Sequence, residues 1–203
     1  MKIIAHRGYW INKEEQNSLT AFRRALDMGF GIEIDVRDYK GQICVSHDPV
    51  NEDSSPKLEN VIDLFSEYNL KLAVNIKSDG IVNTLIPIVE KLKRQNYFFF
   101  DMSIPETIKY LNHKIPVFMR ISEYENPTSL HNHSDGIWLD SFVDDWWVGD
   151  KNIFQKETDY CIVSPELHGR DKTKTWNFLK EISLNDKIYL CTDHPEEARE
   201  FFE

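Results

Sequence analysis

The sequence lacks three features that would have indicated its class at once. No apolar run approaches the roughly 18 residues of a membrane-spanning helix, so we expect no membrane insertion. Positive charge is scarce, because 24 Lys and Arg residues stand against 34 Asp and Glu residues, and the formal net charge is −10. This balance argues against a nucleic-acid partner, although it leaves room for a local basic pocket. The first residues also lack a secretory pattern.

Cysteine is scarce as well, and no segment is repetitive. Cys44, Cys161 and Cys191 are odd in number, far apart and without the spacing of zinc ligands. We therefore expect three reduced, buried thiols in a cytoplasmic protein. No linker, repeat or low-complexity stretch indicates a second unit, so residues 1–203 are expected to form one domain.

Short β-rich runs alternate with amphipathic segments along the chain. The eight predicted strands are Lys2–His6, Gly31–Val36, Lys71–Lys77, Tyr97–Met102, Ile115–Ile121, Gly136–Asp140, Tyr160–Ser164 and Lys187–Thr192. A further run, Gln42–His47, follows the second strand after a Lys40-Gly41 turn. We expect it to form a small hairpin with that strand.

Helical patterns occupy most of the intervening segments. They are marked by Leu19, Phe22 and Leu26 before Gly29, by Leu58, Ile62 and Phe65, by Ile81–Gln95 with a kink at Pro87, and by Trp176, Leu179 and Ile182. Asn17 or Ser18 is expected to cap the first helix, and Asp193 a last helix that Pro195 opens. Eight such units of about 25 residues predict an α/β fold, a compact (β/α)8 TIM barrel. A doubly wound sheet is the alternative.

Polar residues collect where these strands end, which is where barrels of this kind carry their active sites. Glu33 and Asp35 are two residues apart on one strand, so their side chains leave the same face. Adjacent carboxylates repel each other, and a hard divalent cation such as Mg²⁺ or Ca²⁺ relieves that repulsion. The alternative is that both face solvent or pair with Arg7 and Arg37. The apolar neighbours of the two carboxylates speak against free solvation.

Two histidines end β runs in the same way. His6 and His47 titrate near neutral pH, so one can act as a base and the other as an acid, although a lone strand-end histidine is more often structural. Arg7 and Lys77 add positive charge that suits a phosphodiester, whose transition state gains negative charge. For Arg7, an ion pair with Asp35 or Glu33 is an equal alternative.

Several segments in this order resemble the glycerophosphodiester phosphodiesterase family, within the phospholipase-C-like barrel group. The segments are His6-Arg7-Gly8, Asn17-Ser18-Leu19-Thr20-Ala21-Phe22, Gly31-Ile32-Glu33-Ile34-Asp35-Val36, Gly41-Gln42 through Val45-Ser46-His47-Asp48-Pro49, and Ile188 through Pro195. The specific likeness covers about the first quarter of the chain and its last fifteen residues or so. The middle is similar mainly in rhythm.

The resemblance implies a barrel that hydrolyses a small-molecule phosphodiester to an alcohol and an sn-glycerol 3-phosphate type product. By matching positions, His6 and His47 are the acid–base pair, with His6 as the expected base. Glu33 and Asp35 are ligands of one divalent cation, Mg²⁺ or Ca²⁺, and Arg7 and Lys77 contact the phosphate. The resemblance does not imply an oligomeric state.

The chain departs from the family pattern on the third strand and before the first helix. Asn75 stands where the family has a third metal-binding glutamate, so the predicted site holds two carboxylates and binds its cation more weakly. Asp101, Glu123 or Asp140 are candidates to compensate. Gln16 stands where the family has Glu before Asn. The alternatives are a catalytically impaired barrel that binds a phosphorylated ligand, and a related phospholipase or lyase that releases a cyclic phosphate.

Other charged residues at predicted strand ends are not explained by the family pattern. We expect these to recognise the alcohol headgroup: Arg120, Glu123, Asp140, Glu166 and His168. The alternative for Ser164-Pro165-Glu166 is a turn into a helix cap. Trp138, Trp146 and Trp147 are candidates to stack on the headgroup, although packing in the core is the commoner fate of tryptophan.

Overall fold

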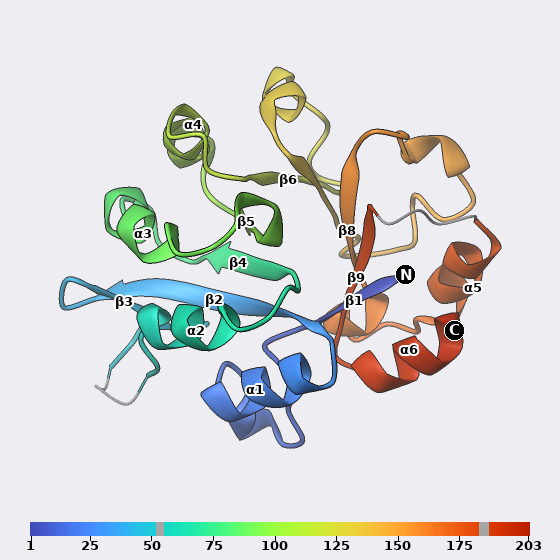
Figure 1. The fold of residues 1–203 in the computed structure, drawn as a ribbon. Coiled ribbons are helices and arrows are strands. Elements are labelled where there is room, and N and C mark those ends of the chain that lie inside the picture. The colour runs from blue at the N-terminus through green and yellow to red at the C-terminus, as the bar shows by residue number, and fades with distance from the viewer. Residues whose placement is uncertain (52–54, 183–186) are drawn as a thin grey trace.

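Nine β-strands form one sheet in the computed structural model, which describes residues 1–51, 55–182 and 187–203. Eight of them lie side by side in the order β5-β4-β2-β1-β9-β8-β7-β6 and curl into a nearly closed barrel (Figure 1). The strands are β1 Lys2–Ala5, β2 Gly31–Tyr39, β3 Gln42–Val45, β4 Leu72–Ile76, β5 Tyr97–Phe100, β6 Phe118–Ile121, β7 Gly136–Leu139, β8 Asp159–Val163 and β9 Ile188–Thr192.

The ladders between neighbouring strands of the barrel are parallel, which confirms the predicted (β/α)8 class. Only β5 and β6 lack a full ladder, and they meet through a parallel bridge between Phe99 and Val117. β3 runs antiparallel to the end of β2, with Val36 opposite Val45, and forms the hairpin that projects from the barrel wall.

Six α-helices cover the outside of the barrel in the described residues (Figure 1). They are α1 Leu19–Asp27, α2 Leu58–Phe65, α3 Val82–Val89, α4 Ile104–Asn112, α5 Thr173–Glu181 and α6 Pro195–Phe202. Short 3-10 helices occupy other connections: η1 Lys13–Glu15, η2 Arg94–Asn96, η3 Ser129–His133, η4 Lys151–Ile153 and η5 Pro165–His168. The β6–β7 and β7–β8 connections carry η3 and η4 in place of α-helices, which explains how the barrel fits a chain of this length.

Local sequence signals explain where several helices begin and end. The Ser18 hydroxyl accepts a hydrogen bond from the Ala21 N–H and caps α1, and Gly29 follows that helix with a positive φ. The helix predicted over Ile81–Gln95 is shorter than expected, because α3 ends at Val89 and a separate 3-10 turn follows. Pro87 lies inside α3, where it removes one helical N–H donor and weakens the turn that would continue the helix.

Side chains alternate between the barrel interior and the helix-facing layer. One buried cluster lies inside the barrel and consists of Ile4, Ala73, Phe98, Phe100, Phe118, Trp138, Cys161, Val163, Tyr189 and Cys191. A larger cluster packs between the strands and the helices. Because side chains two residues apart share a face, Lys2 and His6 lie on the interior face of the β1 segment with Ile4 between them. One strand thus contributes to both ends of the barrel.

All three cysteines are buried, and among the described residues none forms a disulfide, as expected. Within the described ranges, no helix is both long enough and apolar enough to cross a bilayer.

Candidate active site

His6 and Asp193 form a hydrogen-bonded pair at the carboxyl ends of β1 and β9. The parallel register brings Ala5 opposite Thr192, so the residues that follow lie side by side. His6 Nδ1 is 2.7 Å from Asp193 Oδ1, and its Nε2 is 3.9 Å from Glu33 Oε2. Burial disfavours the charged ring, but the Asp193 hydrogen bond and the Glu33 charge outweigh it and raise the pKa of His6. Asp193 therefore fixes the ring with Nε2 directed into the site.

This contact corrects one prediction. Asp193 does not cap α6, because His194 occupies the cap position and makes no side-chain cap bond there. The Asp193 carboxylate is used by His6 instead. The contact with the distant residue His6 thus takes the place of the helix-capping role that the sequence position of Asp193 suggests.

Glu33 and Asp35 are both almost fully buried on β2. Asp35 is held by Arg7 Nε at 3.0 Å, Lys77 Nζ at 3.2 Å and Asn17 Nδ2 at 2.9 Å. Burial opposes its ionisation, but the Lys77 and Arg7 charges and the Asn17 hydrogen bond lower the pKa of Asp35. The alternative pairing of Arg7 with Asp35 is thus present, whereas Arg37 contacts carbonyl oxygens instead.

The surroundings of Glu33 shift its pKa in the opposite direction to that of Asp35. Its Oε2 accepts the Arg7 backbone N–H at 3.1 Å. Burial, followed by the Asp35 charge, raises the pKa of Glu33 to about 7. The carboxylate of Glu33 is therefore poorly compensated by the protein alone, and an added positive charge nearby would stabilise its ionised form.

The loop after β1 holds Arg7 in a constrained conformation. Arg7 and Asn17 both have positive φ, and the Asn17 N–H donates to the Arg7 carbonyl at 3.0 Å. A Cβ added at Gly8 would lie 2.9 Å from atoms of Ala21 and Phe22, so only glycine fits here. The Arg7 guanidinium also donates to Gln16 Oε1 at 3.3 Å. These contacts explain why Arg7 and Gly8 occur in the first motif and why Asn17 begins the second.

The hairpin brings the second histidine to the same end of the barrel. The Ser46 N–H donates to the Asp35 carbonyl at 2.9 Å, and Arg37 donates to the carbonyls of His47 and Lys77. The His47 ring is about half exposed, with Nδ1 2.9 Å from Asp48 Oδ1. Its charge helps to lower the pKa of Asp35. His47 therefore faces the Asp35 side of the site, and His6 faces the Glu33 side.

The residues present fit a hard divalent cation, with an amide as third donor. The described residues contain no group of three His, Cys, Asp or Glu side chains arranged to hold a metal. Asn75 lies opposite Asp35 in the β2–β4 register, and its Oδ1 is buried with no hydrogen-bond partner among the described residues. An orphaned buried carbonyl is costly, and cation coordination would satisfy it. The candidate donors are therefore the oxygens of Glu33, Asp35 and Asn75.

None of the three candidate compensating carboxylates is available to this donor set. Asp101 pairs with Arg120, and Asp140 accepts from His168. The Glu123 carboxylate accepts the backbone N–H groups of residues 142, 143 and 144. Each carboxylate is satisfied by a partner in the other half of the barrel, and Asn75 is left as the third oxygen donor.

A second polar cluster lies at the carboxyl ends of β6 to β8. His168 Nε2 is 2.8 Å from Asp140 Oδ1, Arg120 Nε is 3.8 Å from Asp140 Oδ2, and the ring of Phe142 lies near both the Arg120 guanidinium and the His168 ring. Three of the predicted headgroup residues, Arg120, Asp140 and His168, are thus brought together. Glu123 lies at the edge of this cluster and holds the loop after β7.

Glu166 is placed differently from the rest of its predicted group. Its carboxylate accepts from the Thr192 hydroxyl, the Ser164 hydroxyl and the Asp193 N–H. It therefore supports the Asp193–His6 pair. The turn reading of its segment is what the structure shows, since Pro165–His168 is a 3-10 helix, although the Ser164 side chain caps no N–H.

The three tryptophans separate in the structure. Trp138 is buried and stacks on Phe100 inside the barrel, and Trp147 is buried among aromatic rings. Trp146 is 39% exposed and donates from Nε1 to the Asp140 carbonyl. Only Trp146 presents a ring to solvent beside the second cluster.

Two residues of the site were not predicted from sequence as members of it. Asn17 clamps Asp35 by two hydrogen bonds, from its Nδ2 to the carboxylate and to its Oδ1 from the Asp35 N–H. Asn17 lies in an Asn-Ser segment just before α1, so the sequence indicated a helix cap and gave no sign of its contact with Asp35. Asp193 directly follows β9, and a polar residue at a strand end is a signal for a site. The Pro195 that follows favoured the interpretation of Asp193 as a helix cap.

No protein-family model matches the chain, and a search of curated proteins finds no significant match. Solved structures do match. A glycerophosphodiester phosphodiesterase of Parabacteroides distasonis superimposes with a TM-score of 0.74 at 20% identity, over 99% of this chain and 96% of that one. One of Agrobacterium tumefaciens gives 0.71 at 15% identity, over 100% and 98%.

A third similar structure is a phosphodiesterase of Oleispira antarctica in complex with its product sn-glycerol-3-phosphate. It gives a TM-score of 0.70 at 16% identity, over 99% of this chain and 96% of that one. At these identities the similarity establishes a shared fold over essentially the whole chain. The residues at the carboxyl end of the barrel must carry any argument about chemistry.

Proposed function

We propose that this chain is a divalent-cation-dependent phosphodiesterase of the glycerophosphodiester phosphodiesterase family. The proposal is that it cleaves a small glycerophosphodiester into an alcohol and an sn-glycerol 3-phosphate type product. The observation that carries it is the convergence of two histidines, two buried carboxylates and two cationic side chains at the carboxyl end of β1 to β4. The similar structures support it, since those proteins are named as enzymes of this kind.

The roles of the residues follow from their charges. Arg7 and Lys77 are the cations within reach of a bound phosphate, and in the structure both contact Asp35. A bound Mg²⁺ or Ca²⁺, held by oxygens of Glu33, Asp35 and Asn75, would polarise the phosphate and offset its growing charge. That added charge would also favour ionised Glu33, whose pKa is otherwise raised.

The histidines carry the proton transfers of the proposed reaction. We assign the base to His6, because Asp193 stabilises the imidazolium that forms when Nε2 takes a proton from the attacking hydroxyl or water. His47 is then the acid that protonates the leaving alcohol, and its half-exposed ring exchanges protons with solvent. A cytoplasmic location belongs to the proposal and is supported by the three buried cysteines, which form no disulfide among the described residues.

The test is hydrolysis by metal-stripped protein, with Mg²⁺, Ca²⁺ and Mn²⁺ restored singly. Substrates are a panel of glycerophosphodiesters and a chromogenic diester, and ³¹P NMR identifies the product. We expect activity that a cation restores, that Glu33→Gln abolishes and that Glu67→Gln, at an exposed site outside the barrel mouth, leaves unchanged.

Two other outcomes would overturn the proposal in different ways. A cyclic phosphate as the final product would make the chain a lyase of the same barrel group. No turnover with any cation, alongside calorimetric binding of glycerol 3-phosphate, would show an impaired barrel that binds a phosphorylated ligand.

A further inference from the structure

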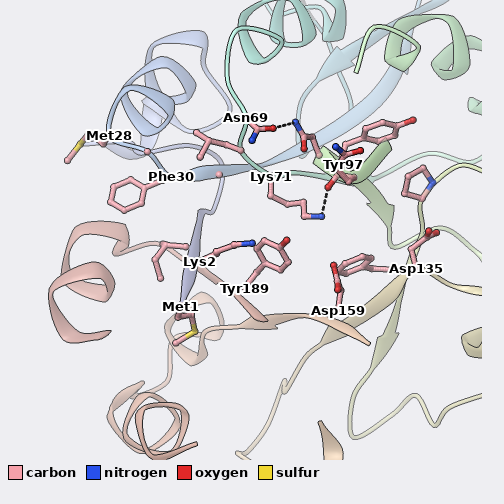
Figure 2. Close-up of a pocket in the computed structure, with 18 of the residues that line it drawn as sticks. Met1, Lys2, Met28, Phe30, Asn69, Lys71, Tyr97, Asp135, Asp159 and Tyr189 are labelled. Atoms are coloured by element: carbon pink, nitrogen blue, oxygen red, sulfur yellow. Dashed lines mark hydrogen bonds between the residues drawn. The ribbon is translucent and has the colours of Figure 1, made fainter. Parts of the chain in front are cut away.

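A cavity of about 810 Å³ opens at the amino end of the barrel, opposite the candidate active site (Figure 2). The residues that begin the strands line it, among them Lys2, Lys71, Tyr97, Phe118, Asp159 and Tyr189. Its volume falls in the range of small-molecule sites, roughly 300–1,000 Å³. The amino end of such a barrel ordinarily serves stability and carries no catalytic residues. The polar groups in this cavity therefore need a separate explanation.

Alternation along the strands places three charged side chains in this cavity. Lys2, Lys71 and Asp159 each precede by two residues a member of the interior cluster, namely Ile4, Ala73 and Cys161. They therefore lie on the interior face, one layer below the packed core. Figure 2 shows the two lysine side chains reaching toward the Tyr189 ring from different strands, with Asp159 on the other side of that ring.

The two ammonium groups are close to one aromatic ring. Lys71 Nζ lies 4.9 Å from the Tyr189 ring centroid and Lys2 Nζ lies 5.5 Å from it. Lys71 Nζ donates to the Gln95 carbonyl at 2.7 Å, which uses one of its three N–H bonds. In the described part of the chain, Lys2 Nζ makes no hydrogen bond. Hydrogen-bond donors thus remain at both ammonium groups.

The acidic groups near the cavity do not fully satisfy these cations. Asp135 is paired with Arg94 and accepts the Val117 N–H. Asp159 is half-buried; burial raises its pKa, and the charges of Lys71, Lys187 and Lys2 oppose that rise. Burial also lowers the pKa of Lys71, and the Asp159 charge opposes this effect. Two ammonium groups, those of Lys71 and the exposed Lys2, thus lie at one buried ring with Asp159 facing both, which leaves one positive charge for an anionic ligand.

The walls indicate the rest of the ligand. Tyr97, Phe118 and Tyr189 are buried aromatic side chains that border the cavity. Flat rings pack well against such walls. Asp159 offers an acceptor for a hydroxyl or N–H group. We propose that this amino-end cavity is a second binding site, which takes a small organic anion, a phosphate or carboxylate attached to a flat ring, with Lys2 and Lys71 at the anionic group.

Pyridoxal 5′-phosphate is a suitable probe, because it joins a phosphate, a flat ring, a hydroxyl and an aldehyde. The aldehyde condenses with an unprotonated lysine amine and releases water, and borohydride then delivers hydride to the imine carbon. Peptide mass spectrometry identifies which lysine is labelled. Pyridoxal is the comparison probe without a phosphate; because its free hydroxyl closes on the aldehyde and lowers its reactivity toward all lysines, labelling of Lys71 is expressed relative to that of exposed lysines in the same sample.

We expect the labelling of Lys71, relative to that of exposed lysines in the same folded sample, to be about tenfold greater with pyridoxal phosphate than with pyridoxal, because the phosphate is held by charge-assisted hydrogen bonds. Lys2→Met should remove most of that preference, and Lys174→Met, at an exposed site on α5, should not change it. Labelling at Lys71 should fall to that of the exposed lysines when the protein is unfolded in urea.

Calorimetric titration with pyridoxal phosphate gives an independent measure. Lys71→Met should weaken the amino-end binding about tenfold without changing diester hydrolysis. Equal labelling of Lys71 by the two probes would show a reactive amine without an anion site and would overturn the proposal. Labelling confined to Lys77 or to exposed lysines would overturn it as well. Either outcome leaves the proposed phosphodiesterase function standing, because that proposal rests on residues at the opposite, carboxyl end of the barrel.

Discussion

The two halves of the barrel's carboxyl end differ in the number of cationic side chains that face their carboxylates. In the β1–β4 half, Arg7 and Lys77 both contact Asp35. In the β6–β8 half, a single guanidinium, that of Arg120, lies between Asp101, Glu125 and Asp140. Under the proposed function, we expect the first half to hold the phosphate, because two cations lie there beside a single carboxylate. We expect the second half, where one guanidinium faces three carboxylates, to hold the uncharged or cationic part of the substrate.

The two halves also differ in how their histidines are held. The His6 side chain is 18% exposed and is oriented through Nδ1 by Asp193, which Glu166 supports from behind. His168 is partly exposed, contacts Asp140 and lies 4.9 Å from the Phe142 ring. A histidine with a carboxylate on one nitrogen and an open site at the other is arranged for proton transfer. His168 also has a carboxylate on one nitrogen, but among the described residues it pairs with Asp140 alone, whereas His6 lies against Glu33 as well as Asp193.

The largest expected effect comes from removing the histidines of the first half. His6→Ala and His47→Ala should each lower kcat/KM about 10³-fold, because each removes one proton transfer. Circular dichroism and thermal unfolding should show an intact fold. His113→Ala, at the exposed end of α4, is the matched control and should keep full activity. Rates close to wild type in both active-site variants would show that the first half is not the catalytic one.

Asp193→Asn should cost less, about 10- to 100-fold in kcat, because the ring of His6 remains but loses its orienting carboxylate. The sign of the pH effect follows from the forces on the ring. Asp193 raises the pKa of His6 against burial, so its removal should move the acidic limb of the kcat/KM profile to lower pH. Asp63→Asn, on the outer face of α2, should leave the profile unchanged. A loss of rate without movement of the limb would indicate a merely structural role.

Much of the first half could be predicted from sequence, because its residues lie in short motifs. His6-Arg7-Gly8 follows β1, Glu33-x-Asp35 lies within β2, and His47 comes shortly after β3. The parallel topology brings the carboxyl ends of these barrel strands to one end of the barrel. The alternation of side chains then decides which of them face inward. In this half, local rules and the global fold agree on where the side chains lie, and the roles of these residues stay a prediction.

Contacts between distant segments could not be predicted in the same way. Asp193 meets its partner His6 across 187 residues, and the local signal of a helix start was stronger than any sign of that contact. Glu166 looked like part of the headgroup site because it follows a strand. Its 3-10 turn directs the carboxylate to Thr192 and the Asp193 N–H instead. The geometry of the turn after a strand decides where a side chain such as that of Glu166 points, and the residue types alone do not reveal that geometry.

Glu33 provides a test that needs no substrate. Its pKa in the folded protein is raised from the ordinary 4.5 to about 7, so neutral Glu33 favours folding. That contribution is fully present below pH 4.5 and is lost as the pH rises through 7. In chelator-treated protein at pH 8, Glu33→Gln should therefore be more stable than wild type, by up to about 3 kcal/mol. At pH 4.5 the two should unfold at nearly the same temperature.

Adding Mg²⁺ or Ca²⁺ at pH 8 should reverse this order, because a cation that binds the folded state stabilises wild type more than the variant. Thermal unfolding with and without the cation measures both effects. If Glu33→Gln is less stable than wild type at pH 8 without a cation, then the ionised carboxylate is satisfied by the protein itself, and the argument for a cation at this position fails.

The smallest expected effect tests the second half. Asp140→Asn keeps the shape of the cluster but removes the charge that contacts His168 and Arg120. We expect KM to rise about three- to tenfold for diesters with cationic alcohols such as choline, with little change in kcat. For an uncharged glycerol headgroup the rise in KM should be smaller, because the binding of such a headgroup depends less on the charge of Asp140. Steady-state kinetics with the two substrates gives the ratio directly. An equal loss of kcat for both substrates would place Asp140 with the reacting groups, and the division of labour between the two halves would then be wrong.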